Sequence, residues 1–172
     1  MNVRIPLVLS LVLLAACSKS SEETATPPPT PAGPVASLPA TLRLDAAPAS
    51  PLSVVDARKG QDGSEVVVVG RVKDLVATRA VFTIADLSLK SCAEPGDTMN
   101  CETPWDYCCE DPARLAAGTA TVEVREGERP FAGTVQGWNG LDHLKQVVVR
   151  GKLAVDAKGN ASVIANGIYV GS

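Results

Sequence analysis

The sequence has few of the residues on which most catalytic sites depend. It holds one histidine, and its aromatic residues are two Trp, two Tyr and two Phe among 172 residues. It has no G-x-S-x-G, H-E-x-x-H, Walker A or G-x-G-x-x-G motif, so the common hydrolase, metalloprotease and nucleotide-binding signatures are absent. A catalytic triad would have to use His143 as its histidine, and no candidate nucleophile lies near it in the sequence. We therefore predict no catalytic residues, no cofactor and no enzymatic activity.

Basic residues are also too few and too scattered for a nucleic-acid-binding stripe. Lys and Arg together number 16 against 19 Asp and Glu, which gives a formal net charge of −3. Proteins that hold single-stranded nucleic acid use cations for the phosphates and exposed aromatic side chains for stacking on the bases. We therefore expect no nucleic-acid partner.

The first apolar run has the length of a signal peptide. Arg4 precedes Ile5–Ala16, a run of about a dozen residues, whereas a membrane span needs about 20. The run ends in LAAC at Cys17, which resembles the bacterial lipobox, where an aliphatic residue and two small residues precede the cysteine that is lipidated. The resemblance implies a signal peptide over residues 1–16 and a lipid anchor on Cys17. An ordinary signal peptide followed by a chance cysteine is the alternative.

This resemblance also predicts the location of the protein. Several acyl chains on Cys17 would anchor it stably to a membrane of the cell envelope, where it would face the periplasm or the exterior. Ser18 follows the cysteine. By analogy with the enterobacterial sorting rule, the absence of aspartate there favours the outer membrane over the inner. Such compartments are oxidising, so the other cysteines are to be considered with disulfides in mind.

A proline-rich stretch separates the lipobox from the rest of the chain. Residues 17–50 are rich in Pro, Ala, Ser and Thr and show no hydrophobic period, so we predict the lipidated N-terminus followed by a disordered, extended linker. Residues 51–172 are long enough for one domain.

This domain shows an all-β pattern. Ser50 and Pro51 predict a short N-terminal helix, and a second short helix is expected near Asn139. Alternating apolar residues predict five strands, over residues 65–73, 80–87, 119–125, 146–155 and 161–170. Three strands, a helix and two further strands are the order of a small Greek-key barrel, the OB-fold. Gly70 and Gly151 lie mid-strand, where a barrel strand coils sharply.

The same strands carry a family resemblance. The segments VVVVGRV, AVFTIADLSL, VVVRGKL and VIANGIYV resemble the anticodon-binding type of OB domain and its secreted bacterial relatives. The resemblance covers about residues 65–170 and implies a five-stranded barrel with a cysteine-rich insertion, residues 90–116, between strands two and three. These motifs specify the geometry of a barrel and not its chemistry.

The insertion holds the four cysteines that follow Cys17. They have the spacing C-x8-C-x6-C-C and are Cys92, Cys101, Cys108 and Cys109. We predict two disulfides, each contributing about 2–4 kcal/mol. Adjacent cysteines rarely bond to each other, so Cys108 and Cys109 should each pair with Cys92 or Cys101, and either pairing remains open. Trp105 and Tyr107 are expected to pack over the sulfurs.

Two other interpretations of the four cysteines remain open. Four thiolates can bind Zn²⁺ or Cu⁺, although a C-C pair lacks the C-x2-C turn that zinc knuckles use. A vicinal pair can also act in thiol redox chemistry, although the acidic neighbours should raise the thiol pKa values. Our main expectation is a non-enzymatic binding or interaction module whose ligand is unknown, an envelope protein or a small ligand. The alternative is a metal-binding or thiol-redox lipoprotein that uses these cysteines. The candidate interaction loop consists of Trp105, Asp106, Tyr107 and Glu110.

Overall fold

The described part of the chain forms a barrel of five strands closed on itself. The structure is a computed structural model, and it describes residues 34–94 and 101–171. The predicted signal peptide and Cys17 lie outside the described residues. Among the described helices, none has both the length and the apolarity needed to cross a membrane.

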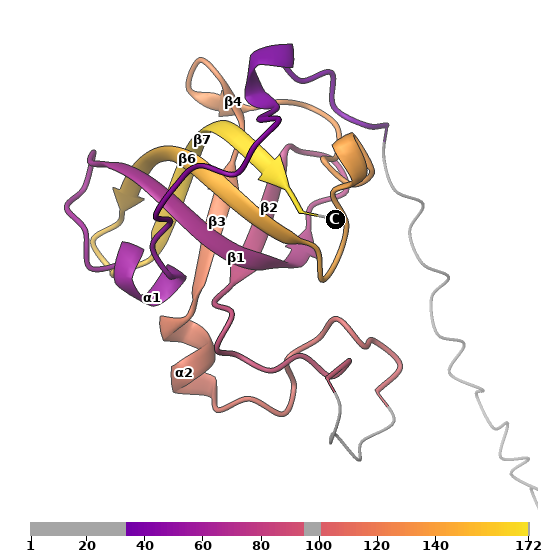
Figure 1. Ribbon diagram of the computed structural model, residues 1–172, viewed down its shortest axis with the longest axis vertical. Coiled ribbons are helices and arrows are strands. Elements are labelled where there is room, and N and C mark those ends of the chain that lie inside the picture. The colour runs from indigo at the N-terminus through magenta and orange to yellow at the C-terminus, as the bar shows by residue number, and fades with distance from the viewer. Residues whose placement is uncertain (1–33, 95–100, 172) are drawn as a thin grey trace, which may run out of the picture. The chain divides into compact units, whose positions relative to one another are not determined.

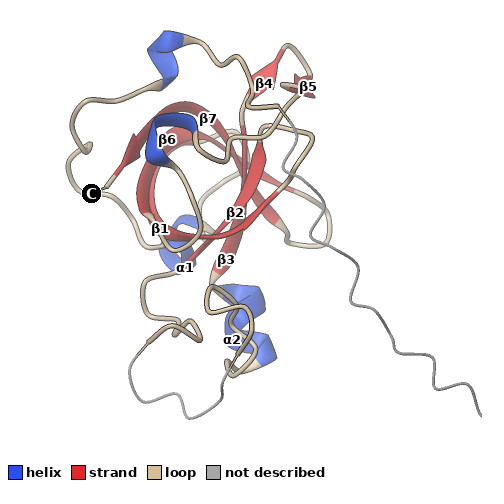
Figure 2. Ribbon diagram, turned by 90° about the vertical axis from the view of Figure 1, so that its right-hand side faces the viewer, coloured by secondary structure: helices blue, strands red, loops and turns tan. Residues whose placement is uncertain are grey.

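The strands have the order that the sequence predicts. They are β1 (Glu65–Leu75), β2 (Val81–Ala85), β3 (Thr119–Glu123), β6 (Gln146–Val155) and β7 (Ala161–Val170). The barrel runs β1-β2-β3-β7-β6 and closes by antiparallel pairing of β6 with β1, while β3 and β7 are parallel. This is OB-fold connectivity, and the all-β prediction is confirmed. Figures 1 and 2 show α2 (Pro112–Ala117) and the short hairpin of β4 (Arg125–Glu126) and β5 (Arg129–Pro130) at opposite ends of the barrel.

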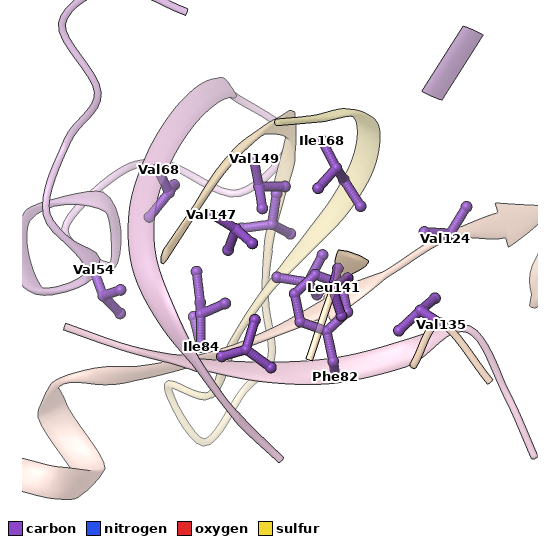
Figure 3. Close-up of a cluster of buried hydrophobic side chains, with 14 of the residues drawn as sticks. Val54, Val68, Phe82, Ile84, Val124, Val135, Leu141, Val147, Val149 and Ile168 are labelled. Carbon is purple, nitrogen blue, oxygen red and sulfur yellow. The ribbon is translucent and has the colours of Figure 1, made fainter. Parts of the chain in front are cut away.

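The hydrophobic core of the barrel follows from the alternation of inward-facing and outward-facing residues along the strands. Val68, Val122 and Val149 come from three different strands and have no exposed surface. Figure 3 shows how side chains from all sides converge, among them Phe82 and Ile84 of β2. The inward-facing residues that the sequence predicts are therefore the ones that are buried.

Two glycines allow the strands to coil tightly. A Cβ atom on Gly70 would lie 2.9 Å from the Ala85 carbonyl oxygen, and one on Gly151 would collide with the Ile164 carbonyl. The pairing of β6 with β7 shifts register next to Gly151, where Asn166 is the extra residue. Asn166 thus forms a β-bulge in β7.

The first helix begins later than predicted. α1 (Val54–Ala57) has Ser53 as its N-cap, and the Ser53 hydroxyl accepts a hydrogen bond from the Asp56 amide. Ser50 has a φ of 53°, which lies outside the helical region, so the prediction of a helix starting at Ser50 was wrong. Because Ser53 offers the same capping oxygen with a carboxylate three residues later, it makes the better start.

The predicted linker reaches too far toward the C-terminus. Residues 34–44 lie against the barrel: the Ala36 amide donates to the Thr134 carbonyl at 2.7 Å, and the Leu44 amide donates to the Ile168 carbonyl at 3.0 Å. The turn η1 (Ala40–Leu42) buries Leu42 in the core. The ordered domain therefore begins before residue 51. Isolated apolar side chains in a proline-rich stretch are enough to bind it to the barrel.

The second predicted helix is one 3-10 turn, η2 (Trp138–Gly140). Asn139 has a φ of 49° and lies within this turn, so it does not cap a helix. Leu141 is fully buried, as predicted for an inward-facing residue. The chain between β3 and β6 thus crosses the barrel mostly as loop and hairpin.

Candidate functional site

The insertion between β2 and β3 is bound to the barrel by a small second core. Tyr107 is 1% exposed and packs with Ala85, Leu89 and Leu115. Ala85 ends β2 and Leu115 belongs to α2, so Tyr107 fixes the middle of the insertion to both of its ends. Tyr107 therefore serves as an anchor for the insertion.

Polar contacts join the insertion to the outside of β1. Arg71 Nη1 donates to Glu94 Oε1 at 2.6 Å, and this hydrogen bond lowers the pKa of Glu94. The hydroxyl of Tyr107 is buried and makes no well-formed hydrogen bond to any described residue. Burial raises the pKa of Tyr107, although the nearby Arg71 charge opposes the rise. The Arg71–Glu94 ion pair and the buried Tyr107 ring thus both hold the insertion to the barrel.

Asp86 fixes the first turn of the insertion to α1. Its carboxylate accepts hydrogen bonds from the Val55 amide at 3.1 Å and from the Ser88 amide at 3.0 Å and hydroxyl at 2.8 Å. Burial acts to raise the pKa of Asp86, but these hydrogen bonds outweigh it, and the pKa is lowered. The turn that leads toward the cysteines is therefore held in place at its first residue, Asp86.

A β-turn presents the vicinal cysteines to solvent. The Glu110 amide donates to the Tyr107 carbonyl at 3.0 Å, so Cys108 and Cys109 occupy the two central positions of the turn, and both are exposed. The Cys92 amide donates to the Asp106 carbonyl at 2.8 Å and brings the start of the insertion to this turn. Cys92 thereby meets a vicinal pair that begins 16 residues later in the sequence.

The sulfur atoms gather around Cys108. Its Sγ lies 3.3 Å from that of Cys92, 3.4 Å from that of Cys101 and 3.8 Å from that of Cys109. The Sγ atoms of Cys92, Cys108 and Cys109 all lie within 4.8 Å of one another. We call these four residues the thiol cluster.

The predicted disulfides are not formed. A disulfide bond is about 2.05 Å long, and no such bond joins the cysteines of the thiol cluster, all of which are among the described residues. Cys92 and Cys101 both approach Cys108, and one sulfur can bond to only one of them. The arrangement thus differs from the two pairings that the sequence predicts.

The thiols influence one another's protonation. Hydrogen bonding with the thiols of Cys92 and Cys108, followed by burial, raises the pKa of Cys101 to about 12. The sequence predicted raised thiol pKa values from acidic neighbours, but at Cys101 the neighbouring thiols are the cause. Cys101 is therefore protonated at neutral pH unless a cation favours its thiolate.

Trp105 lies against a residue that the sequence analysis did not connect with it. Its ring stacks on His143 with centroids 4.8 Å apart, and 36% of Trp105 remains exposed. His143 Nδ1 lies 3.2 Å from Asp142 Oδ1, which orients the ring. His143 follows β3 and η2 in the chain, so only the closure of the barrel brings it to the insertion.

The other two residues of the predicted interaction loop have different surroundings. The Glu110 carboxylate accepts a hydrogen bond from the Lys90 amide at 2.7 Å and pairs with Arg114 at 3.2 Å, so it holds the insertion together. Asp106 lies 4.0 Å from Lys73 Nζ and stays partly exposed. Of the four predicted residues, Trp105 and Asp106 are therefore available to a partner.

A shallow groove lies on the outer face of the barrel beside α2. It consists of two adjoining pockets of about 310 and 240 Å³, which share Thr83, Ala116 and Thr119. Lys73 lines one pocket and Arg58 the other. Arg58 already donates to the Thr119 carbonyl at 2.6 Å, so its charge is partly engaged in holding β3.

Fold and site together define a closed OB-type barrel with a cysteine-bearing insertion between β2 and β3. No protein-family model matches the chain, and no curated protein matches it. Among solved structures, the chain is similar to the hypothetical protein ygiW from E. coli, with 15% sequence identity, coverage of 71% of this chain and 90% of that chain, and a TM-score of 0.41. A likeness this distant carries no argument about function, and the fold assignment rests on the strand order and register described above.

Proposed function

We propose that this protein is a non-enzymatic binding module of the cell envelope, anchored by lipid at Cys17, and that the insertion is its binding part. The lipobox-like LAAC and the proline-rich stretch after it support the anchor, and Ser18 favours the outer membrane. Facing away from the bilayer, the barrel would present the insertion to an envelope protein or a small ligand.

The observation that carries this proposal is the division of the insertion into an anchored side and an exposed side. Tyr107 and the Glu94–Arg71 ion pair fix it to the barrel. Trp105, Cys108 and Cys109 stay exposed. A preorganised surface of aromatic and sulfur groups loses little conformational entropy on binding, which favours recognition.

The chemistry of one thiol of the cluster, that of Cys101, favours binding over catalysis. A nucleophilic or redox-active cysteine needs a depressed pKa, because the thiolate is the reactive species. The pKa of Cys101 is instead raised to about 12. This thiol is therefore a poor nucleophile at neutral pH.

A photo-crosslinking amino acid placed at residue 105 in living cells tests this proposal. The matched control carries it at exposed Lys158, in the turn between β6 and β7. We expect crosslinked species at residue 105 that do not form at residue 158. Identical patterns at both positions would show that the insertion does not bind an envelope protein.

A further inference from the structure

We propose that the thiol cluster is a site for a thiophilic metal ion, Cu⁺ or Zn²⁺, with Cys108 as the central ligand. Cys92 and Cys109 complete a three-sulfur set around the ion, and Cys101 supplies the fourth donor. This inference deepens the proposed function by naming the ligand class of the insertion. It depends on the proposed function only for the location of the protein, which decides in which compartment the protein encounters the ion.

The spacing of the sulfurs carries the inference. Thiolates that surround one ion at about 2.3 Å lie about 3.8 Å apart. The observed separations from Cys108 are 3.3, 3.4 and 3.8 Å. They exceed a disulfide bond of about 2.05 Å by more than 1 Å, whereas a shift of a few tenths of an ångström reaches the metal-bound spacing.

The β-turn supplies the geometry that the C-C spacing lacks in sequence. A zinc knuckle uses C-x2-C so that a turn directs two sulfurs toward one ion. Here Cys108 and Cys109 are themselves the central residues of the turn closed by Tyr107 and Glu110, and their sulfurs lie 3.8 Å apart. The vicinal pair therefore directs two sulfur ligands toward one ion from a single β-turn.

The donor type selects the ion. Soft thiolates favour Cu⁺ and Zn²⁺ over hard ions such as Mg²⁺ and Ca²⁺. Cys108 and Cys109 are exposed, so a bound ion can enter and leave without unfolding the barrel. An exposed site of this kind suits reversible acquisition of a metal better than a structural role, for which zinc sites are closed.

Metal binding also explains how the cysteines of an envelope protein stay reduced. Thiols at contact distance in an oxidising compartment form disulfides unless something holds them. A bound cation holds them as coordinated thiolates and releases their protons. The proposed location and the thiol arrangement are then compatible.

The test uses the full chain with Cys17→Ser, so that the thiol cluster contains every remaining cysteine. The reduced protein is titrated without oxygen with Cu⁺, in competition with a Cu⁺ chelator, and separately with Zn²⁺, in competition with a colorimetric chelator. We expect one ion per chain and a thiolate-to-metal charge-transfer band with Cu⁺. Cys108→Ser should lower the affinity by more than about 100-fold and Cys101→Ser by less, with Thr103→Ala as the matched exposed control that changes nothing.

Circular dichroism of each variant checks that the barrel stays folded. Equal metal affinity in the parent chain and in folded Cys108→Ser would overturn the inference, as would the absence of binding to either ion. Crosslinking at residue 105 needs no metal, so its success with a failed titration would leave the proposed function standing. Metal binding in a chain that crosslinks equally at residues 105 and 158 would overturn the envelope-protein partner of the proposed function and leave the metal site standing.

Discussion

At the scale of single residues, Asp86 contributes to stability through its charge. It is 5% exposed and accepts hydrogen bonds from Val55 and Ser88. We predict that Asp86→Ala lowers the free energy of unfolding by about 1–3 kcal/mol, because the Val55 amide loses its partner. Denaturant unfolding of both proteins at pH 7 measures this difference.

The same carboxylate predicts a pH dependence. Because the folded-state pKa of Asp86 is lowered, its contribution is fully present above the unfolded pKa of about 3.9 and is lost as the pH falls through the folded-state value. The stability difference between the parent chain and Asp86→Ala should therefore shrink below about pH 4. A difference that stays constant from pH 7 to pH 2 would contradict this role.

Tyr107 separates the effect of a ring from the effect of a hydroxyl. The ring is buried with Leu89 and Leu115, whereas the hydroxyl makes no well-formed hydrogen bond to a described residue. Tyr107→Ala should cost about 3–5 kcal/mol or detach the insertion, while Tyr107→Phe should change stability by less than about 0.5 kcal/mol. Thermal unfolding of both variants measures this, and a large loss in Tyr107→Phe would show that the hydroxyl makes a stabilising hydrogen bond.

The two aromatic residues of the insertion show what a local sequence can predict. The sequence shows that Trp105 and Tyr107 both lie in the insertion, and the structure buries Tyr107. The sequence could not tell that Tyr107 packs inward and Trp105 outward, because both stand in the same acidic stretch. It could not connect Trp105 with His143 either, since that contact depends on barrel closure.

At the scale of elements, the strands were predictable and the helices were not. β1 repeats a buried position every second residue over most of its length, and β6 and β7 do so over part of theirs. α1 has four residues and η2 three, which is too short for a helical period to show. For such elements one capping residue decides the start, and Ser50 and Ser53 are both candidates in sequence.

The strand assignment predicts where truncation is costly. Val68→Ala, Val122→Ala and Val149→Ala should each lower the free energy of unfolding by about 2–3 kcal/mol, because each side chain is fully buried in the barrel. Thr121→Ala, on the outer face of β3, should change it by under about 0.5 kcal/mol. Denaturant unfolding measures both classes, and similar losses in both would mean that the inward face is misassigned.

At the scale of the whole molecule, the chain combines a fold that the sequence reveals with a site that it reveals only in part. The cysteine positions and their insertion were readable from the sequence. The approach of Cys92 and Cys101 to the same sulfur was not, because it depends on the turn at Cys108 and on the docking of Tyr107. The spacing of the cysteines in the sequence alone favoured two separate disulfide pairs.

Anchoring is also a property of the whole molecule. Cys17→Ser should abolish lipidation, because the lipobox cysteine provides the thiol that would receive the lipid. We expect the substituted protein to leave the membrane fraction or to remain as precursor. Detergent partitioning and mass spectrometry of both proteins provide the measurement, and a diacylglyceryl mass on the substituted protein would contradict the anchor.

The state of the sulfurs in the exported protein tests most directly that the insertion is a ligand-binding site. The protein is taken from its membrane without reductant, and its intact mass is measured under native and denaturing conditions. We predict one bound Cu⁺ or Zn²⁺ in the native mass, with four thiols recovered after the ion is removed. A metal-free mass lower by four hydrogens, as two disulfides produce, would contradict this and leave the cysteines with a purely structural role.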